Sequence, residues 1–427
     1  MLASNREFSI DTCLEPEAMR VLLQQSLPGF ADGRLTIAQL RIVKARRNAS
    51  IQRNPNRLTL CYELDVRDAV TGGTGTQQFY GKVYRNGASA QVALGTPALH
   101  LPQLDMLLWA WPADPGLPQL PALLEANQTV AWWGEPARQV AVIRHEPERR
   151  ATLRYTRYYG DPIYAKTFFD DRGEAIHRRF VHFWDLSQVD DRAPSVAQPL
   201  GYTPDTRALW QAQASGVPLL QVLQQSFAAS LPARVAYAFA LLHTAPLALA
   251  GPNSRDRAHW LAEVRRRQNK ITRTAPELAE RAARLADAIE ATSSSLPEPP
   301  LALIHGDCHP EQLWVAGERV VLFDFDEFSL GDPMEDLAEF ITKLGGQDTT
   351  GQHCAGSQLA TALLASYAEM APAHFCRHRL QWHLAVQQLL QASRAFVFQV
   401  NDWRDELERR LARAEALATP MGTEART

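Results

Sequence analysis

The chain has 427 residues, of which 46% are hydrophobic and 21% are charged, and its formal net charge is -3. That length exceeds what one ordinary core organises, so two or three folding units are expected. The composition is that of a globular protein in water, and the small negative charge argues against nucleic acid or an anionic membrane as a partner.

Cysteine usage and the absence of apolar runs bear on the compartment. The five cysteines, at positions 13, 61, 308, 354 and 376, are scattered and form no CxxC pair. Their odd number favours a reducing compartment over a disulfide framework. No signal-peptide pattern and no apolar run of about 18 residues is visible, so a cytoplasmic protein without a membrane span is expected. The sequence does not indicate an oligomeric state.

The first part of the chain combines helical and β patterns. Residues 1–45 are expected to be helical, most clearly at "PEAMRVLLQQSL" (16–27). Residues 58–66 and 77–87 are strand candidates on either side of the turn "TGGTGT", which predicts a hairpin. The Pro- and Trp-rich stretch 96–124 is interpreted as a connector without a long helix.

A similar β pattern returns at residues 148–171. Each copy contains "TL", one variable residue and "Y", and then a lysine that follows an aromatic and a small residue, Lys82 or Lys166. Two hairpins can resemble each other by chance, and the alternative is a duplicated small sheet. The matching segments are 59–62 with 152–155, and 80–87 with 164–171.

From residue 172 onward the pattern is mainly helical. Apolar residues recur three or four positions apart, as on one face of a helix, and Ser230 is a plausible N-cap with Pro232 in the first turn. Short strands are expected at 301–304 and 319–325. The helical stripes are Ile176, Phe180 and Phe183; Leu231, Val235, Phe239 and Leu242; Leu278, Ala282, Leu285 and Ile289; and Trp403, Leu407, Leu411 and Ala414.

The stretch "LIHGDCHPEQLWV" (303–315) gathers polar residues between apolar flanks. Asp307 follows one short strand, and Asp324 lies near the end of the next among apolar neighbours, where a carboxylate is costly unless it meets a cation or a strong donor. Loops at strand ends can bring Asp307, Gln312 and Asp324 to one point. Amide and carboxylate oxygens suit Mg²⁺, which leaves Asp307 to accept a proton from a substrate hydroxyl.

This layout resembles the active site of protein-kinase-like phosphotransferases. "HGDCHPEQ" (305–312) keeps the His, the Asp and the five-residue step of H-x-D-x-x-x-x-N, with Gln312 in place of Asn. "LFDFDEFSLGDPMEDLAEF" (322–340) is similar to the metal-binding segment of the aminoglycoside phosphotransferase and choline kinase-like family, and 199–250 is similar to its hinge and first large-lobe helix. A glutamine at this position also occurs in the maltokinase-like members of that family.

The resemblance implies an α+β, protein-kinase-like bilobal fold with a small antiparallel β lobe, a large mainly helical lobe and an extra N-terminal β-rich cap. It also implies a small-molecule phosphotransferase that uses ATP, with GTP not excluded, and Mg²⁺. The expected parts are a cap at 1–128, which is a candidate duplicated small-lobe sheet, a small lobe at 129–198, and a large lobe at 199–427 with catalytic loop 305–312 and metal-binding segment 322–336.

The family pattern assigns roles to particular residues. Asp307 is the expected base, and Gln312 and Asp324 are the expected Mg²⁺ ligands. Lys166 is the expected phosphate lysine, paired with Glu174 on the following helix, and Lys82 competes with it for that role. No glycine-rich loop precedes Lys166; "HEPERRATLRY" stands there instead, with Arg149 as a candidate phosphate contact.

The other polar residues of the motif have plainer interpretations. His305 is expected to orient the loop, Cys308 to pack, and His309 either to bond backbone or to approach phosphate. Asp326 is either part of the metal shell or solvated, and Asp332 and Asp336 are expected to cap and anchor the following helix and loop.

Two other functions stay open. A non-catalytic nucleotide-binding protein is suggested by Gln312 and the missing glycine loop, and a metallohydrolase by His305, Asp307 and His309. The acceptor is expected to be a sugar, an aminoglycoside or an amino-alcohol-like molecule, held near residues 254–270 and 370–405.

Overall fold

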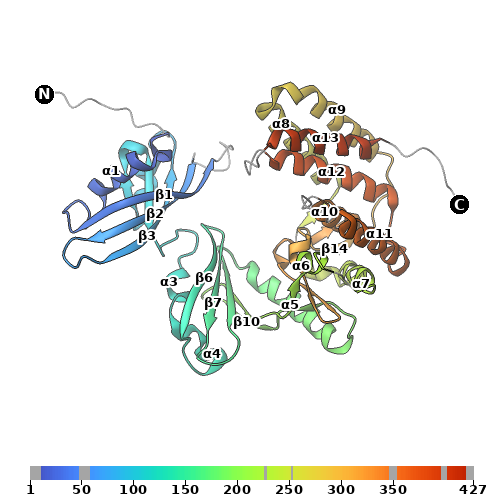
Figure 1. The fold of residues 1–427 in the computed structure, drawn as a ribbon, viewed down its shortest axis with the longest axis horizontal. Coiled ribbons are helices and arrows are strands. Elements are labelled where there is room, and N and C mark those ends of the chain that lie inside the picture. The colour runs from blue at the N-terminus through green and yellow to red at the C-terminus, as the bar shows by residue number, and fades with distance from the viewer. Residues whose placement is uncertain are drawn as a thin grey trace. The chain divides into compact units, whose positions relative to one another are not determined.

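The computed structural model describes residues 11–47, 58–225, 228–251, 253–345, 353–395 and 402–419. The chain divides into two compact units, one made of Met1–Gly173 with Tyr202–Trp210 and the other of Glu174–Gly201 with Gln211–Thr427. Strands dominate the first unit and helices the second (Figure 1). The expected α+β class, with an antiparallel β part and a mainly helical part, is confirmed.

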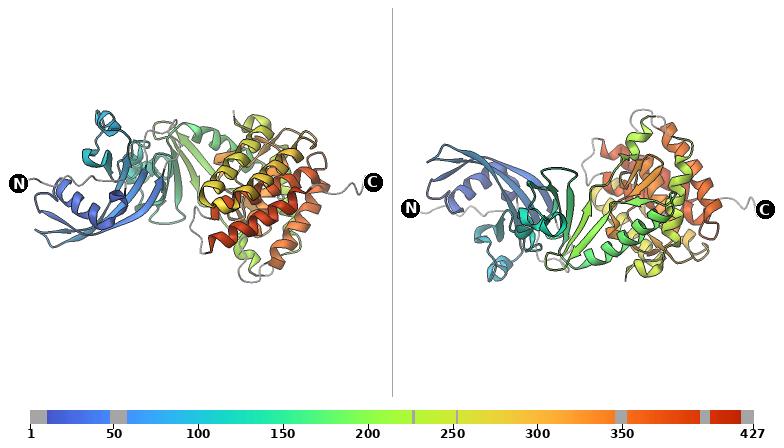
Figure 2. Two further views of the ribbon diagram at one scale, coloured as in Figure 1. Left: turned by 90° about the horizontal axis from the view of Figure 1, so that it is seen from above. Right: turned by 90° about the horizontal axis from the view of Figure 1, so that it is seen from below.

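The first sheet has the strand order β1-β2-β3-β5-β4. Helix α1 (Pro16–Ser26) packs on one face, where Met19, Leu22 and Leu23 share a core with the inward residues of the sheet (Figure 2). Leucines and a tyrosine alternate inward along β2, so one face of the strand is apolar. The strands are β1 (Leu35–Arg47), β2 (Leu58–Asp68), β3 (Thr74–Val83), β4 (Leu99–Leu101) and β5 (Met106–Ala110).

Two expectations for this unit are wrong. Residues 35–45, which were expected to be helical, belong to strand β1, and the stretch interpreted as a connector contributes β4 and β5. In β1, register shifts between Ile37 and Gln39 and between Ile42 and Lys44 break the two-residue period that identifies a strand. In β5, four successive residues are buried, so no alternation was available to indicate a strand.

The second sheet repeats this arrangement. Its order, β6-β7-β8-β11-β10, matches β1-β2-β3-β5-β4 position by position. Lys82 lies opposite Thr59 in the first sheet, and Lys166 lies opposite Thr152 in the second, so the register also matches. The shared order and register support duplication of a small β unit, which remains a proposal. The strands are β6 (Gln139–Glu146), β7 (Arg150–Thr156), β8 (Ile163–Phe168), β10 (Pro199–Thr203) and β11 (Ala208–Ala212).

Short helices connect the strands of this part of the chain, and a longer helix follows β8. Helix α5 buries Ile176, Phe180 and Phe183, the stripe expected from the sequence. The helices are α2 (Ala88–Ala93), α3 (Leu120–Leu123), α4 (Val130–Trp133) and α5 (Arg172–Val189).

The second unit contains two small sheets that carry the polar motif. One has the order β12-β15-β16-β9 and the other the order β13-β17-β14. The strand at the front of the motif is shorter than expected by one residue, and the strand before Asp324 ends at Leu322. The strands are β9 (Ser195–Val196), β12 (Val217–Pro218), β13 (Ser254–Arg255), β14 (Ala302–Ile304), β15 (Leu313–Ala316), β16 (Arg319–Leu322) and β17 (Ser329–Gly331).

The remaining helices build the cores of the second unit. Helices α8, α9, α12 and α13 share one hydrophobic cluster and lie side by side in yellow, orange and red in Figure 2. The expected stripes on α7, α9 and α13 are the buried faces, apart from the partly buried Leu278 and Trp403. The helices are α6 (Leu219–Leu223), α7 (Leu231–Thr244), α8 (Arg257–Thr274), α9 (Ala279–Ser293), α10 (Pro333–Leu344), α11 (His353–Met370), α12 (Arg377–Ala395) and α13 (Trp403–Ala418).

Two further expectations concern cysteines and membranes. Among the described residues, Cys13, Cys61, Cys308 and Cys376 are free thiols, and the side chain of Cys354 lies outside them. None of the described helices combines the length and apolar character that crossing a membrane requires.

Candidate active site

The polar motif forms a loop between β14 and β15. Gly306 has φ +77°, and a Cβ atom there would meet the Glu327 carbonyl oxygen at 2.5 Å. Both facts require glycine, since other residues rarely adopt this conformation and would collide with backbone. The backbone next to Asp307 is therefore fixed in a path that only glycine allows.

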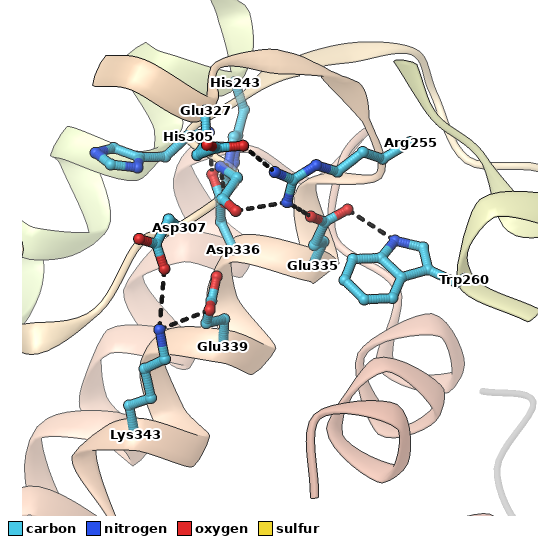
Figure 3. A network of polar contacts seen from close by, with 11 residues as sticks. His243, Arg255, Trp260, His305, Asp307, Glu327, Glu335, Asp336, Glu339 and Lys343 are labelled. Atoms are coloured by element: carbon cyan, nitrogen blue, oxygen red, sulfur yellow. Dashed lines mark hydrogen bonds and ion pairs between the residues drawn. The ribbon is translucent and has the colours of Figure 1, made fainter. Parts of the chain in front are cut away.

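Asp336 on α10 holds this loop through its buried carboxylate (Figure 3). Its Oδ2 accepts a hydrogen bond from His305 N at 2.7 Å, and its Oδ1 accepts one from Gly306 N at 2.9 Å. His243 Nε2 lies 3.3 Å from Oδ2. Burial acts to raise the pKa of Asp336, but the donors from His243 and the loop prevail, and the pKa is lowered.

Asp332 anchors the start of α10. Its Oδ1 accepts a hydrogen bond from Met334 N at 3.0 Å, which caps the helix. Its Oδ2 accepts one from Arg379 Nε at 2.9 Å, and His383 Nε2 is 3.3 Å away. The anchoring roles predicted for Asp332 and Asp336 are thus confirmed.

His305 and Cys308 are structural. His305 is fully buried, its Nε2 donates to the Phe323 carbonyl oxygen at 2.8 Å, and its ring meets the rings of Phe325 and Phe328. The Cys308 thiol is buried, and burial raises its pKa well above the ordinary value. Orientation by His305 and packing by Cys308 are both confirmed.

Asp307 presents its carboxylate beside a cation that the sequence reasoning missed. Its side chain is 42% exposed, and its Oδ1 lies 3.1 Å from Lys343 Nζ. Lys343 also pairs with Glu339 at 2.7 Å, one turn earlier on α10 (Figure 3). The available signal was the helical spacing of Asp336, Glu339 and Lys343, three and four residues apart, directly after the family-like "GDP" segment.

The structure brings Gln312 and Asp324 together. Gln312 ends the 3-10 turn Pro310–Gln312, and its Nε2 lies 3.4 Å from Asp324 Oδ2. Phe323 N donates to the Gln312 carbonyl oxygen at 3.0 Å, which ties the loop to the Asp324 segment. Asp324 is half-buried and has φ 59°, an uncommon conformation for a residue other than glycine. Such strain is typical of functional positions.

This pair is chemically suited to Mg²⁺. A carboxylate and a side-chain amide supply hard oxygen donors, once a half-turn of the Gln312 amide exchanges its nitrogen and oxygen. Mg²⁺ keeps several waters and takes further ligands from phosphates, so two protein ligands suffice. Across the described residues, no group of three or more His, Cys, Asp or Glu side chains is arranged to hold a metal.

His309 lies in the loop between Asp307 and Gln312. Its Nε2 lies 3.3 Å from Gln312 Nε2, and its Nδ1 lies 3.7 Å from Glu311. Burial and the nearby Lys343 cation lower the pKa of His309. A neutral imidazole is therefore expected at physiological pH, which favours hydrogen bonding over attraction of phosphate.

A second, partly buried network supports the loop from the other side. Arg255 donates to the Gly306 carbonyl oxygen and pairs with Glu335 at 2.9 Å and Glu327 at 3.2 Å (Figure 3). Trp260 Nε1 donates to Glu335 at 2.9 Å. Burial raises the pKa of Glu335 to about 8 against the opposing attraction of Arg255. Sequence reasoning missed these residues because their partners are distant in the chain.

A cavity of about 210 Å³ adjoins this network. Its walls come from both regions expected to hold the acceptor, residues 254–270 and 370–405, of which 396–401 lie outside the described residues. The walls include Arg255, Trp260, Asp332, Trp382 and His383.

The residues expected to contact phosphates lie in or beside the second sheet. Lys166 is on β8, with its ammonium 5.5 Å from the Phe168 ring centroid, and Glu174 is exposed in the first turn of α5. Pairing between these two side chains stays a prediction. Arg149 lies in the β6–β7 turn, and its side chain is exposed and 3.6 Å from Glu146.

Lys82 forms an ion pair with a carboxylate of the β6–β7 turn. Its ammonium pairs with Glu148, whose other oxygen accepts a hydrogen bond from Tyr80 at 2.8 Å. Asp114 accepts a hydrogen bond from the Glu148 backbone N–H at 2.9 Å. Lys82 therefore anchors the turn.

The chain was compared with protein families. Residues 177–383 match the phosphotransferase enzyme family. The resemblance inferred from the motif is confirmed over this segment, which contains Asp307, Gln312 and Asp324. The match supports a small-molecule phosphotransferase. No curated protein matches the sequence.

Solved structures of this kind resemble the chain at low identity. A choline/ethanolamine kinase family protein from Mesorhizobium loti is 19% identical with a TM-score of 0.48, over 70% of this chain and 93% of that one. A spectinomycin phosphotransferase in complex with ADP and spectinomycin is 12% identical with a TM-score of 0.47, over 68% and 97%. An aminoglycoside phosphotransferase in complex with AMP-PNP and hygromycin B is 14% identical with a TM-score of 0.47, over 70% and 99%.

Proposed function

We propose that this protein is an ATP-dependent small-molecule O-phosphotransferase, with GTP as an alternative donor. It transfers the γ-phosphate to a hydroxyl of a sugar, an aminoglycoside or an amino-alcohol-like acceptor. The observation that carries the proposal is the approach of Gln312 to Asp324 within 3.4 Å, from a loop that also presents the exposed carboxylate of Asp307. The family match over residues 177–383 supports phosphotransferase chemistry.

In this proposal Asp307 is the general base. Its carboxylate accepts the proton of the acceptor hydroxyl as the acceptor oxygen forms a bond to the γ-phosphorus, and the bond from that phosphorus to the bridging oxygen breaks. A positioned base typically contributes about 10²–10⁴-fold to such a reaction. The contacts of the loop with Asp336 and Arg255 keep the carboxylate in place.

The remaining groups bind the nucleotide. Gln312 and Asp324 would hold Mg²⁺, which neutralises phosphate charge when it is bound. Lys166, paired with Glu174, and Arg149 would add positive charge around the phosphates. The cavity beside Arg255 and Trp260 is our candidate for the acceptor pocket, since its wall residue Arg255 also donates to the Gly306 carbonyl oxygen and two of its walls are tryptophans.

The test is ATP consumption by the purified protein with Mg²⁺ and a panel of hydroxylated acceptors. We expect Asp307→Ala and Asp324→Ala to lower turnover at least about 10²-fold, since each removes a group required in the transition state. Glu311→Gln is the matched control, because Glu311 is an exposed acid in the same loop. Wild-type turnover in both alanine variants on an active acceptor would overturn the assignment.

The competing proposal is a nucleotide-binding protein without catalysis. The observation that favours it is the β6–β7 turn, which holds Glu148 rather than glycines and uses that carboxylate to bind Lys82. Calorimetric titration with Mg·ATP separates the two proposals. Binding without turnover over the whole acceptor panel would favour the non-catalytic protein.

A further inference from the structure

The surroundings of the proposed base contain one cation shared by two carboxylates. Lys343 Nζ lies 3.1 Å from Asp307 Oδ1 and 2.7 Å from Glu339 Oε1. The lysine side chain is 18% exposed and Glu339 is 8% exposed, whereas Asp307 opens to solvent. The cation is thus held from the protein side by a buried acid on its own helix and turned toward the exposed carboxylate of the loop (Figure 3).

Helical geometry explains why Lys343 reaches both acids. Glu339 and Lys343 are four residues apart on α10, so their side chains meet on one face. Asp336, three residues before Glu339, is on that face and holds the backbone of His305 and Gly306. One face of one helix therefore fixes both the backbone before Asp307 and one oxygen of its carboxylate.

We propose that Lys343 is a positioning residue for phosphoryl transfer, with Glu339 as its anchor: it binds Asp307 Oδ1 and leaves Oδ2 for the acceptor hydroxyl. This inference rests on the proposed role of Asp307 as base. An ammonium 3.1 Å from one carboxylate oxygen holds that oxygen by a charge-assisted hydrogen bond. It also restricts rotation of the carboxylate, and misplacement of a catalytic group by about 1 Å costs about 10²-fold in rate.

Charge balance is consistent with this role. In the resting site Lys343 faces two acids, and burial raises the pKa of Glu339 to about 7. When Asp307 takes the proton from the acceptor hydroxyl, it becomes neutral, and Lys343 keeps Glu339 as its partner. Lys343 thus keeps a hydrogen-bond acceptor before and after the transfer.

The test compares Lys343→Met, Lys343→Arg and wild type by steady-state kinetics with Mg·ATP and an acceptor on which the wild type is active. We expect Lys343→Met to lower kcat about 10²-fold, with KM for ATP and the Kd for Mg·ADP within about twofold of wild type. Lys343→Arg restores kcat to within about tenfold, because it keeps the charge. Lys44→Met is the control, since Lys44 is an exposed lysine on strand β1, outside the catalytic and acceptor-binding residues.

Two further variants, Glu339→Gln and Asp307→Ala, distinguish failure of the positioning role from failure of the proposed function. Glu339→Gln keeps a hydrogen-bond acceptor but removes the anchoring charge, and we expect it to lower kcat several-fold even if Lys343→Met folds poorly. If wild type transfers no phosphate to any acceptor, the proposed function and this inference both fail. If wild type is active and Asp307→Ala is not, while Lys343→Met and Glu339→Gln keep wild-type kcat, the base assignment stands and the positioning role is overturned.

Discussion

At the scale of single residues, Asp336 shows how a buried charge organises a loop. The carboxylate is fully buried, and its two oxygens accept from two successive backbone N–H groups while His243 lies beside it. An amide in its place offers one acceptor and brings two donors toward donors that already face the site. The charge itself, rather than the size of the side chain, is therefore required.

The corresponding prediction concerns stability. We expect Asp336→Asn to lower the free energy of unfolding by about 2–4 kcal/mol, because it leaves buried donors unsatisfied. Urea unfolding followed by circular dichroism measures the change. Asp171→Asn is the control, since that side chain is 78% exposed and a surface change of this kind stays within about 0.5 kcal/mol. Equal effects of the two variants would contradict the role of Asp336.

Glu335 leads to a prediction about pH. Burial raises its pKa from the ordinary 4.5 to about 8. Between these two pH values the folded protein holds a proton that the unfolded chain releases. The stabilisation from this bound proton is complete below the pKa of the unfolded state, and it is lost as pH rises through the pKa of the folded state. Between about pH 5 and about pH 8, the unfolding free energy of wild type should fall more steeply than that of Glu335→Gln, by about 1–3 kcal/mol.

Urea unfolding at both pH values measures this difference. Glu280→Gln is the control, because the side chain of Glu280 is 87% exposed. Parallel pH dependence in wild type and Glu335→Gln would show that Arg255 keeps Glu335 ionised throughout.

At the scale of elements, the two sheets of the first unit share strand order and register, but the equivalent lysines have different surroundings. Lys82 is paired with Glu148 from the β6–β7 turn, whereas Lys166 lies beside the Phe168 ring. Glu148 also has φ 60°, so the turn keeps a strained residue in place with the help of Lys82, Tyr80 and Asp114. The first sheet thus stabilises the turn of the second.

We predict that Lys82→Met loosens this turn. Removing the cation leaves the half-buried Glu148 carboxylate poorly paired, at a cost of about 1–2 kcal/mol. Hydrogen exchange should become faster at the Glu148 and Arg149 amides than in Lys44→Met, which removes an exposed lysine of β1. Unchanged exchange in Lys82→Met would mean that Tyr80 and Asp114 hold the turn without Lys82.

The elements also show where sequence patterns suffice. The amphipathic stripes of α5, α7, α9 and α13 identified these helices, because a helix that packs against a core must repeat apolar residues at its own period. Strand β1 was missed because its bulges interrupt the two-residue period of a strand. Strand β5 was missed because both of its faces are buried, so its residues do not alternate. Local patterns are reliable where an element has one buried face and a regular backbone.

At the scale of the whole molecule, the proposed function predicts that nucleotide binding stabilises the protein. A ligand that binds only the folded state raises the midpoint of thermal unfolding. Mg·ADP should therefore raise the Tm of wild type by several degrees, and chelation of Mg²⁺ or Asp324→Ala should remove most of that increase. Glu311→Gln should keep the increase. An increase in Tm that is the same with and without Mg²⁺ would contradict the proposed role of Gln312 and Asp324 as metal ligands.

The sequence by itself determined the chemical motif. The positions of Asp307, Gln312 and Asp324 follow from short spacings within one loop and the next strand end, and such spacings are visible in the letters. Tertiary structure decided the partners. Lys343 is 36 residues from Asp307, and Glu148 is 66 residues from Lys82. A charged side chain can meet many opposite charges in a chain of this length, and only the packing of α10 against the loop, and of one sheet against the turn of the next, selects among them.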